Sequence, residues 1–182
     1  MVNIYKLKLT NLQQEILRLL FIKVGTSLNA RNIAVILEVS QPAVSKALPK
    51  LEKEELIKIK KEEYSNRFSI ELNRDNHKVI WIKRIDNIKQ IYESGLVQFL
   101  YDNFHSGKII LFGSYAYGED TINSDVDLAI IGDKKKDVDL NKFNKILERK
   151  VIINYYDSFK KIDKHLLNNI LNGIILKGTV EL

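Results

Sequence analysis

The chain has 182 residues, of which 45% are hydrophobic, and its formal net charge is +6. This length fits one domain or two small ones, with enough apolar residues for globular cores. The absence of a long uncharged apolar run excludes a transmembrane helix, and the absence of cysteine excludes disulfides and thiolate metal sites. Because the start of the chain also lacks an apolar signal core, we expect a cytoplasmic protein with no membrane partner.

The N-terminal part predicts three helices followed by a two-stranded hairpin. Apolar residues at helical spacing indicate the helices, and alternating apolar and polar residues indicate the strands. Ser40 is a suitable N-cap for the third helix, with Pro42 in its first turn. The predicted segments are 11–24, 33–37, 41–53, 56–60 and 67–72. This order of elements is that of a winged helix-turn-helix, which we expect over residues 1–72.

The same part of the chain carries most of the net positive charge. Residues 1–72 hold 12 Lys and Arg against 8 Asp and Glu, whereas residues 73–182 hold 17 against 15. This bias indicates a polyanionic partner. The polar face of the third helix and the hairpin supply donors for phosphates and base edges. The candidate DNA-binding residues are Gln41, Ser45, Lys46, Lys50 and Arg67.

The stretch SLNARNIAVILEVSQPAVSKALPKLEKEELIKI, which starts at Ser27, resembles the MarR-type winged helices of bacterial and archaeal repressors. The resemblance implies DNA binding and transcription regulation. A winged helix that binds protein, or that only supports its neighbour, stays open as an alternative. Residues 73–94 predict a linker helix, which could form a homodimer contact or pack against its own two domains.

A Gly-Ser turn and two aspartates form the most informative pattern of the chain. The apolar run Ile109–Phe112 suits a buried strand and leads directly into Gly113 and Ser114. Gly113 permits a sharp turn and the close approach of a phosphate, and Ser114 offers hydrogen-bond donors. After ten intervening residues, Asp125 and Asp127 are two apart on a second predicted strand, so their carboxylates lie on one face. Such a pair suits Mg²⁺.

In this order and spacing, the pattern resembles the DNA polymerase beta nucleotidyltransferase superfamily, and is most similar to its minimal members. The resemblance spans about residues 95–180. It implies an α+β chain, in which the winged helix-turn-helix is joined to a C-terminal α/β nucleotidyltransferase domain with a mixed sheet, which we expect over residues 95–182. It implies that Asp125 and Asp127 are catalytic residues that bind Mg²⁺. Gly113 and Ser114 would bind a nucleoside triphosphate such as ATP.

The resemblance further implies transfer of a nucleoside monophosphate to a protein or small-molecule acceptor, with release of pyrophosphate. Relatives often act with a small helical partner protein, as in toxin–antitoxin pairs, which implies such a partner here. Towards the end of the chain we expect a helix over 140–150, a strand over 151–156 and a helix over 162–176.

Two positions depart from the superfamily pattern. Active members carry a third carboxylate on the next strand, where this chain has Ile152; Asn154 and Asp157 are the nearest candidates to replace it. Tyr117 stands where many relatives have an arginine. These departures keep a second interpretation open, in which the chain is a transcriptional regulator with a degenerate, nucleotide-sensing domain.

Overall fold

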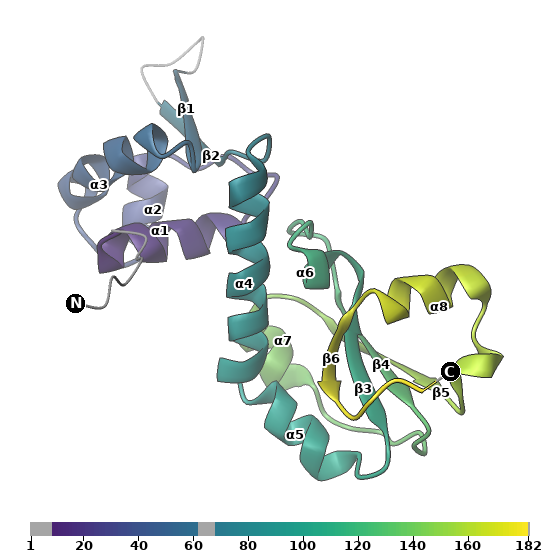
Figure 1. Cartoon of the computed structure of the whole chain (residues 1–182). Helices are drawn as coiled ribbons and strands as arrows, with labels where there is room; N and C mark the ends of the chain where they lie inside the picture. Colours follow the sequence, from purple (N-terminus) through teal and green to yellow (C-terminus); the bar gives the residue numbers. More distant parts are fainter. Residues whose placement is uncertain (1–8, 62–67, 182) are drawn as a thin grey trace, which may run out of the picture. The chain divides into compact units, whose positions relative to one another are not determined.

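The chain divides into two compact units, residues 1–79 and 80–182. The computed structural model, shown in Figure 1, describes residues 9–61 and 68–181. Within these ranges, no helix combines the length and apolar character that a membrane span needs.

The first unit is a winged helix-turn-helix, as predicted. Its elements are α1 (Asn11–Ile22), α2 (Ala30–Ile36), α3 (Gln41–Lys53), β1 (Ile57–Lys61) and β2 (Phe68–Leu72). The antiparallel β1 and β2 pair from Ile57 opposite Leu72, and Leu28 adds a bridge to Ile70. Helices α2 and α3 are joined by a short turn, and the hairpin follows α3 (Figure 1).

Side-chain caps explain where the three helices begin. Thr10 and Gln13 cap each other's backbone at the start of α1, and Asn29 and Asn32 do the same at α2. At α3, the Ser40 hydroxyl accepts a hydrogen bond from the backbone of the third helical residue. These capping residues fix where the helices begin. The apolar pattern predicted these positions less accurately, most notably the start of α2.

The second unit is built on a mixed four-stranded sheet with the strand order β5–β4–β3–β6. β3 pairs antiparallel with β4 and β6, whereas β4 and β5 are parallel. The strands are β3 (Lys108–Phe112), β4 (Val126–Ile131), β5 (Val151–Tyr156) and β6 (Ile174–Lys177). The helices are α4 (His77–Glu93), α5 (Leu96–Asn103), α6 (Gly113–Tyr117), α7 (Asn141–Leu147), the 3-10 helix η1 (Phe159–Lys161) and α8 (Lys164–Leu171).

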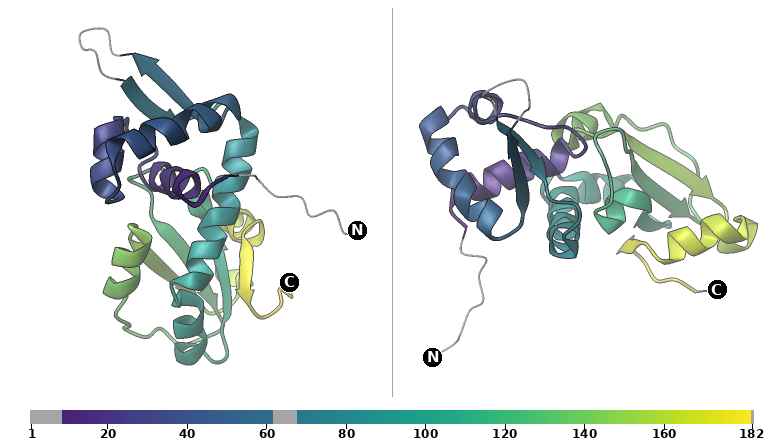
Figure 2. Two further views of the ribbon diagram at one scale, coloured as in Figure 1. Left: turned by 90° about the vertical axis from the view of Figure 1, so that its left-hand side faces the viewer. Right: turned by 90° about the horizontal axis from the view of Figure 1, so that it is seen from above.

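Helices cover both faces of this sheet (Figure 2). One face packs on α5, α7 and the end of α4 through a core that includes Leu100, Leu128 and Phe143. The other face packs on α8 and η1 through Ile110, Ala129 and neighbouring residues. Because side chains alternate along β4, the residues that share a face with Ala129 are Asp127 and Ile131.

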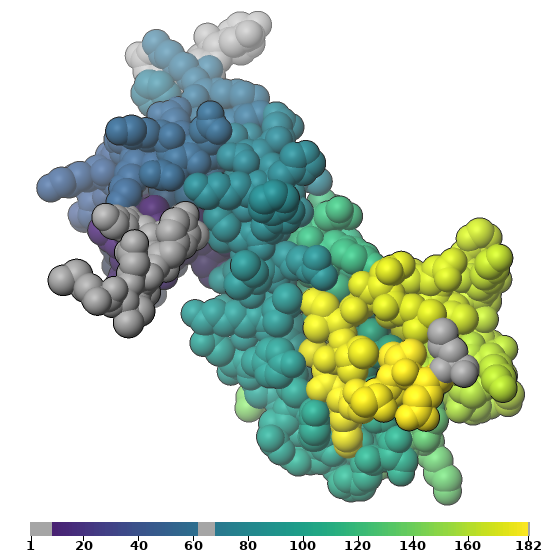
Figure 3. Space-filling view, viewed as in Figure 1, coloured from purple at the N-terminus to yellow at the C-terminus, as the bar shows by residue number. Residues whose placement is uncertain are grey.

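The end of the chain differs from the prediction of a helix over 162–176. Helix α8 ends at Leu171, and Ile174–Lys177 form the edge strand β6. Gly173 causes the change of direction: a Cβ atom there would lie 2.4 Å from the Leu111 carbonyl oxygen, so only glycine allows this approach to β3. The edge strand β6 and residues 178–181 lie on the face of the unit that Figure 3 shows, although Leu176 of β6 is buried.

Candidate functional site

The structure brings Gly113 and Asp127 into direct contact. Phe112 and Asp127 form the last pair of the β3–β4 ladder, and the chain leaves β3 at Gly113 with φ of 75°. A Cβ atom at Gly113 would lie 2.8 Å from Asp127 Oδ2. Glycine is therefore required twice, for its left-handed backbone and for the carboxylate that lies against its Cα.

Asp125 directly precedes β4, and both aspartates are half-buried. Burial raises the pKa of Asp127, and the neighbouring Asp125 charge raises the pKa further. Within residues 9–61 and 68–181, neither carboxylate forms an ion pair with a basic side chain. Two adjacent carboxylates without a protein cation fit Mg²⁺, which commonly takes one or two carboxylates together with substrate phosphates. No group of three or more candidate metal ligands occurs among the described residues.

Ser114 follows Gly113 in the first turn of α6 and is half-buried. Its carbonyl oxygen accepts a hydrogen bond from the backbone of Glu119 at 2.9 Å, which closes the turn after α6. Its hydroxyl makes no hydrogen bond within the described part of the chain, so the hydroxyl is free to donate to a ligand.

The register of β4 and β5 identifies the residue at the third carboxylate position. Asp127 pairs with Ile152, whereas Asn154 lies two residues further along, opposite Ala129. Asp157 follows the end of β5 and forms an ion pair with Lys161. Measured along the strand direction, Asp157 lies at least four residues, or about 13 Å, beyond Asp127. An apolar residue therefore occupies the third position, and Asp157 is too distant to replace the missing acid.

Tyr156 is a neighbour of the site that the sequence analysis missed. It alternates with Ile152 and Asn154 on the face of β5 that Asp127 shares. Burial raises the pKa of the Tyr156 hydroxyl, and the Asp127 charge contributes to the rise. The alternation along β5 could have indicated this residue, because every second side chain after Ile152 is on the same face.

A guanidinium group lies close to Tyr117 even though no arginine occurs at that position. The Arg84 guanidinium carbon is 5.7 Å from the centre of the Tyr117 ring. Arg84 comes from α4, 33 positions earlier in the chain. No sequence spacing indicates this contact, because it depends on how α4 packs against α6.

The predicted DNA-binding residues of α3 lie on its exposed face. Gln41, Ser45, Lys46 and Lys50 are all exposed, whereas the opposite face of α3 is buried in the core of the first unit. The fifth predicted contact, Arg67, lies outside the described residues. The arrangement of α3 thus keeps four of the candidates accessible to a partner.

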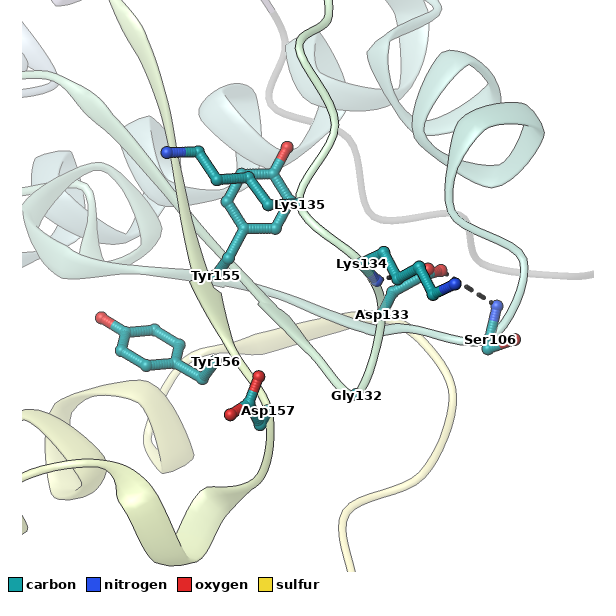
Figure 4. A pocket seen from close by; sticks show the side chains of 8 residues that line it. All are labelled: Ser106, Gly132, Asp133, Lys134, Lys135, Tyr155, Tyr156 and Asp157. Carbon is teal, nitrogen blue, oxygen red and sulfur yellow. Dashed lines mark hydrogen bonds between the residues drawn. The ribbon is translucent and has the colours of Figure 1, made fainter.

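A pocket of about 540 Å³ lies at the opposite end of the sheet, where β4 and β5 end (Figure 4). Its lining includes Asp133, whose carboxylate accepts hydrogen bonds from the backbone of Ser106 and Gly107, each at 3.1 Å. Lys134, Lys135 and Asp157 also line it. This pocket contains neither Asp125 nor Asp127, and Tyr156 is the lining residue that shares the face of Asp127.

Comparison with known proteins agrees with the C-terminal geometry. Residues 93–176 match the sequence model of the family described as nucleotidyltransferase domain. A comparison with curated proteins found no match.

Among solved structures, the N-terminal region is similar to MarR-family winged-helix regulators. A mutant form of Lactococcus lactis ZitR is 27% identical, with 57% of this chain and 67% of that chain covered and a TM-score of 0.43. The adhesin competence repressor AdcR of Streptococcus pyogenes is 28% identical, with 52% and 69% covered and a TM-score of 0.39. The MepR–DNA complex of S. aureus is 25% identical, with 52% and 81% covered and a TM-score of 0.38. The winged-helix assignment itself rests on the topology of α1–α3 and the β1–β2 hairpin.

Proposed function

We propose that this chain, whose residues 93–176 match the nucleotidyltransferase domain family, is a DNA-binding protein that transfers a nucleoside monophosphate from a nucleoside triphosphate to a hydroxyl acceptor. The observation that carries the proposal is the Asp127 carboxylate held against Gly113, with Asp125 beside it and no basic side chain paired to either within the described residues. The acceptor that we propose is a hydroxyl of a protein or of a small molecule.

Each site residue has a defined part in this reaction. Asp125 and Asp127 would hold Mg²⁺, and Gly113 leaves room for the phosphates next to them. When bound, Mg²⁺ supplies charge neutralisation and orients the triphosphate. The Ser114 hydroxyl donates to a phosphate oxygen. The acceptor oxygen attacks the α-phosphorus, the bond to the pyrophosphate oxygen breaks, and the acceptor proton leaves to a carboxylate or to water.

A second function, nucleotide sensing without transfer, is favoured by one observation. Ile152 is the partner of Asp127 on β5, so the third carboxylate that would take the acceptor proton is replaced by an apolar side chain. In this case the domain would bind Mg²⁺ and nucleotide as a signal to the DNA-binding unit. The two functions predict the same ligands and differ only in whether the nucleotide is cleaved.

For DNA, we propose that α3 enters the major groove and that Gln41, Ser45, Lys46 and Lys50 contact phosphates and base edges. The exposure of all four side chains supports this proposal.

We also propose that the protein acts with a second copy or with a small helical partner, as in toxin–antitoxin pairs. The apolar side chains on α4 support a contact of this kind: Trp81, Ile85 and Tyr92 are 65%, 67% and 51% exposed.

The test is incubation of the purified protein with Mg²⁺ and each α-labelled nucleoside triphosphate in a lysate of its host. The control is the double variant Asp125→Asn and Asp127→Asn. Label on a protein or small molecule that requires the unmutated chain establishes transfer and identifies the acceptor. Mg²⁺-dependent nucleotide binding without transfer supports the sensing function. If the unmutated chain shows neither, the proposed site is wrong.

A further inference from the structure

Four polar side chains form a buried cluster beside the candidate site. Lys83, Asn87, Asp120 and Arg149 are only 1%, 2%, 1% and 5% exposed. Charged residues are rarely this deeply buried, and when they are, they are paired and hydrogen-bonded. The cluster contains none of the residues assigned to the metal, the phosphates or DNA, so its purpose is not explained by the proposed function alone.

Asp120 is the centre of this cluster. Lys83 Nζ donates to its carboxylate and, at 2.9 Å, to its backbone carbonyl oxygen. Asn87 Nδ2 donates to the same carboxylate oxygen at 2.7 Å, and Arg149 Nη2 donates to the other oxygen at 3.2 Å. Two cations and an amide thus hold one carboxylate from both sides, which fixes the position and the rotation of Asp120.

Two partners of Asp120 are linked to the segments that carry the site. Asn87 Nδ2 also donates to the Tyr115 carbonyl oxygen of α6 at 3.0 Å, directly after the Gly-Ser turn. Arg149 is followed by Lys150, whose carbonyl oxygen accepts from the backbone of Val126, between the two aspartates, at 2.8 Å. The cluster therefore joins the Gly-Ser turn and the start of β4 to a single helix, α4.

The connection from Asp120 to the metal carboxylates is short and ordered. In the tight turn between Asp120 and Asp125, Thr121 N donates to Ser124 Oγ at 2.9 Å, and Ser124 N donates to the Thr121 carbonyl oxygen at 3.0 Å. Movement of Asp120 would therefore be transmitted to Asp125.

Gly118, which ends α6, gives independent evidence that α4 and this loop must fit closely. Its φ is 77°, and a Cβ atom there would lie 2.6 Å from the Ile80 carbonyl oxygen and 2.7 Å from the Arg84 backbone nitrogen. The loop thus contacts the backbone of α4 without an intervening side chain. Two separate contacts with α4 therefore hold the segment between the Gly-Ser turn and the aspartates. One is the polar contact of Asp120, and the other is the close backbone contact at Gly118.

We propose that Asp120, held by Lys83, Asn87 and Arg149, is a positioning residue that sets the distance between the Gly-Ser turn and the Asp125–Asp127 pair. The proposal rests on the proposed function of that pair. A buried ion cluster contributes little net stability compared with apolar residues of the same size, but it demands one geometry. A site that must place two carboxylates against a triphosphate depends on such a geometry.

The test measures the Mg²⁺ concentration needed to bind a non-hydrolysable α,β-methylene analogue of ATP, by calorimetry, together with the thermal unfolding midpoint. Two variants are compared with the unmutated chain. Asp120→Asn keeps the shape of the side chain, and Asn87→Ala removes two hydrogen bonds without leaving a buried charge unpaired. The matched control is Asp157→Asn, which breaks the exposed pair with Lys161 in the same unit.

We expect both cluster variants to require at least tenfold more Mg²⁺ at a temperature where circular dichroism shows them folded, whereas the control binds as before. If Asp120→Asn does not fold, Asn87→Ala decides the question alone. A folded cluster variant with a lower unfolding midpoint but an unchanged Mg²⁺ requirement would overturn the positioning role and leave the proposed function intact. Absence of Mg²⁺-dependent binding by the unmutated chain would overturn both.

Discussion

The substitution Ile152→Asp tests whether the register of β4 and β5 has been interpreted correctly. Ile152 pairs with Asp127 on adjacent parallel strands, so the new carboxylate would stand about 5 Å from the existing one. Two unit charges at this distance repel by about 3 kcal/mol at an effective dielectric constant of about 20. Solvent at this half-buried position reduces the figure to roughly half.

When a divalent cation lies between the two carboxylates, both attract the cation, and the second carboxylate then favours binding. A gain of about 1.4 kcal/mol corresponds to a tenfold change in affinity. We therefore expect Ile152→Asp to lower the Mg²⁺ concentration required for binding the ATP analogue about tenfold. Without Mg²⁺, the variant should unfold at a lower temperature than the unmutated chain, and added Mg²⁺ should restore part of the difference.

The matched control is Asn154→Asp, which adds the same charge on the same face but opposite Ala129. This position is about 7 Å further along the strand, so its effect on Mg²⁺ binding should be small. Calorimetry measures the Mg²⁺ requirement, and circular dichroism measures the unfolding midpoint with and without Mg²⁺. If both substitutions change the Mg²⁺ requirement equally, or if only Asn154→Asp does, the reasoning from the register is wrong.

Three further predictions follow from single contacts. Gly113→Ala should reduce Mg²⁺–nucleotide binding at least tenfold, whereas Gly132→Ala, with φ of 80° but no Cβ contact closer than 4.0 Å, should cost about 1 kcal/mol of stability and leave binding unchanged. Lys46→Ala with Lys50→Ala should weaken DNA binding and reduce the slope of log affinity against log salt by about 2, measured by fluorescence anisotropy; an unchanged slope would exclude α3 as the contact. Burial raises the pKa of Asp133, but three backbone N–H donors lower it below the ordinary value overall. Asp133→Asn should therefore reduce stability above about pH 4, and this difference should disappear as the pH falls through the lowered pKa.

Local patterns predicted the elements that fix the site. The apolar run Ile109–Phe112 and the run over 151–156 are strands, as predicted. The sharp turn that the Gly-Ser pattern indicates occurs at Gly113, which has a left-handed backbone. The resemblance to the nucleotidyltransferase superfamily implied that the missing acid falls near Ile152, and the structure pairs Ile152 with Asp127. These features depend on residues close together in the sequence.

Features that depend on distant pairing were not predictable in the same way. The local pattern of β6 predicts a helix. Its strand conformation depends on pairing with β3, more than 60 residues earlier in the chain, which the local pattern does not reveal. Asp120 resembles any polar loop residue until α4 brings Lys83 and Asn87 to it. The Arg84–Tyr117 contact likewise depends on packing between helices rather than on spacing.

Helix α4 is one uninterrupted helix of 17 residues, of which residues 77–79 belong to the first unit and the remainder to the second. The same helix carries the Lys83 and Asn87 side chains that hold the loop of the site. Any influence of DNA on nucleotide affinity that passes through this helix must obey thermodynamic reciprocity. DNA that tightens nucleotide binding by a given factor would then itself be bound more tightly, by the same factor, when nucleotide is present. The affinity of either ligand, measured with and without the other, therefore reports the coupling for both.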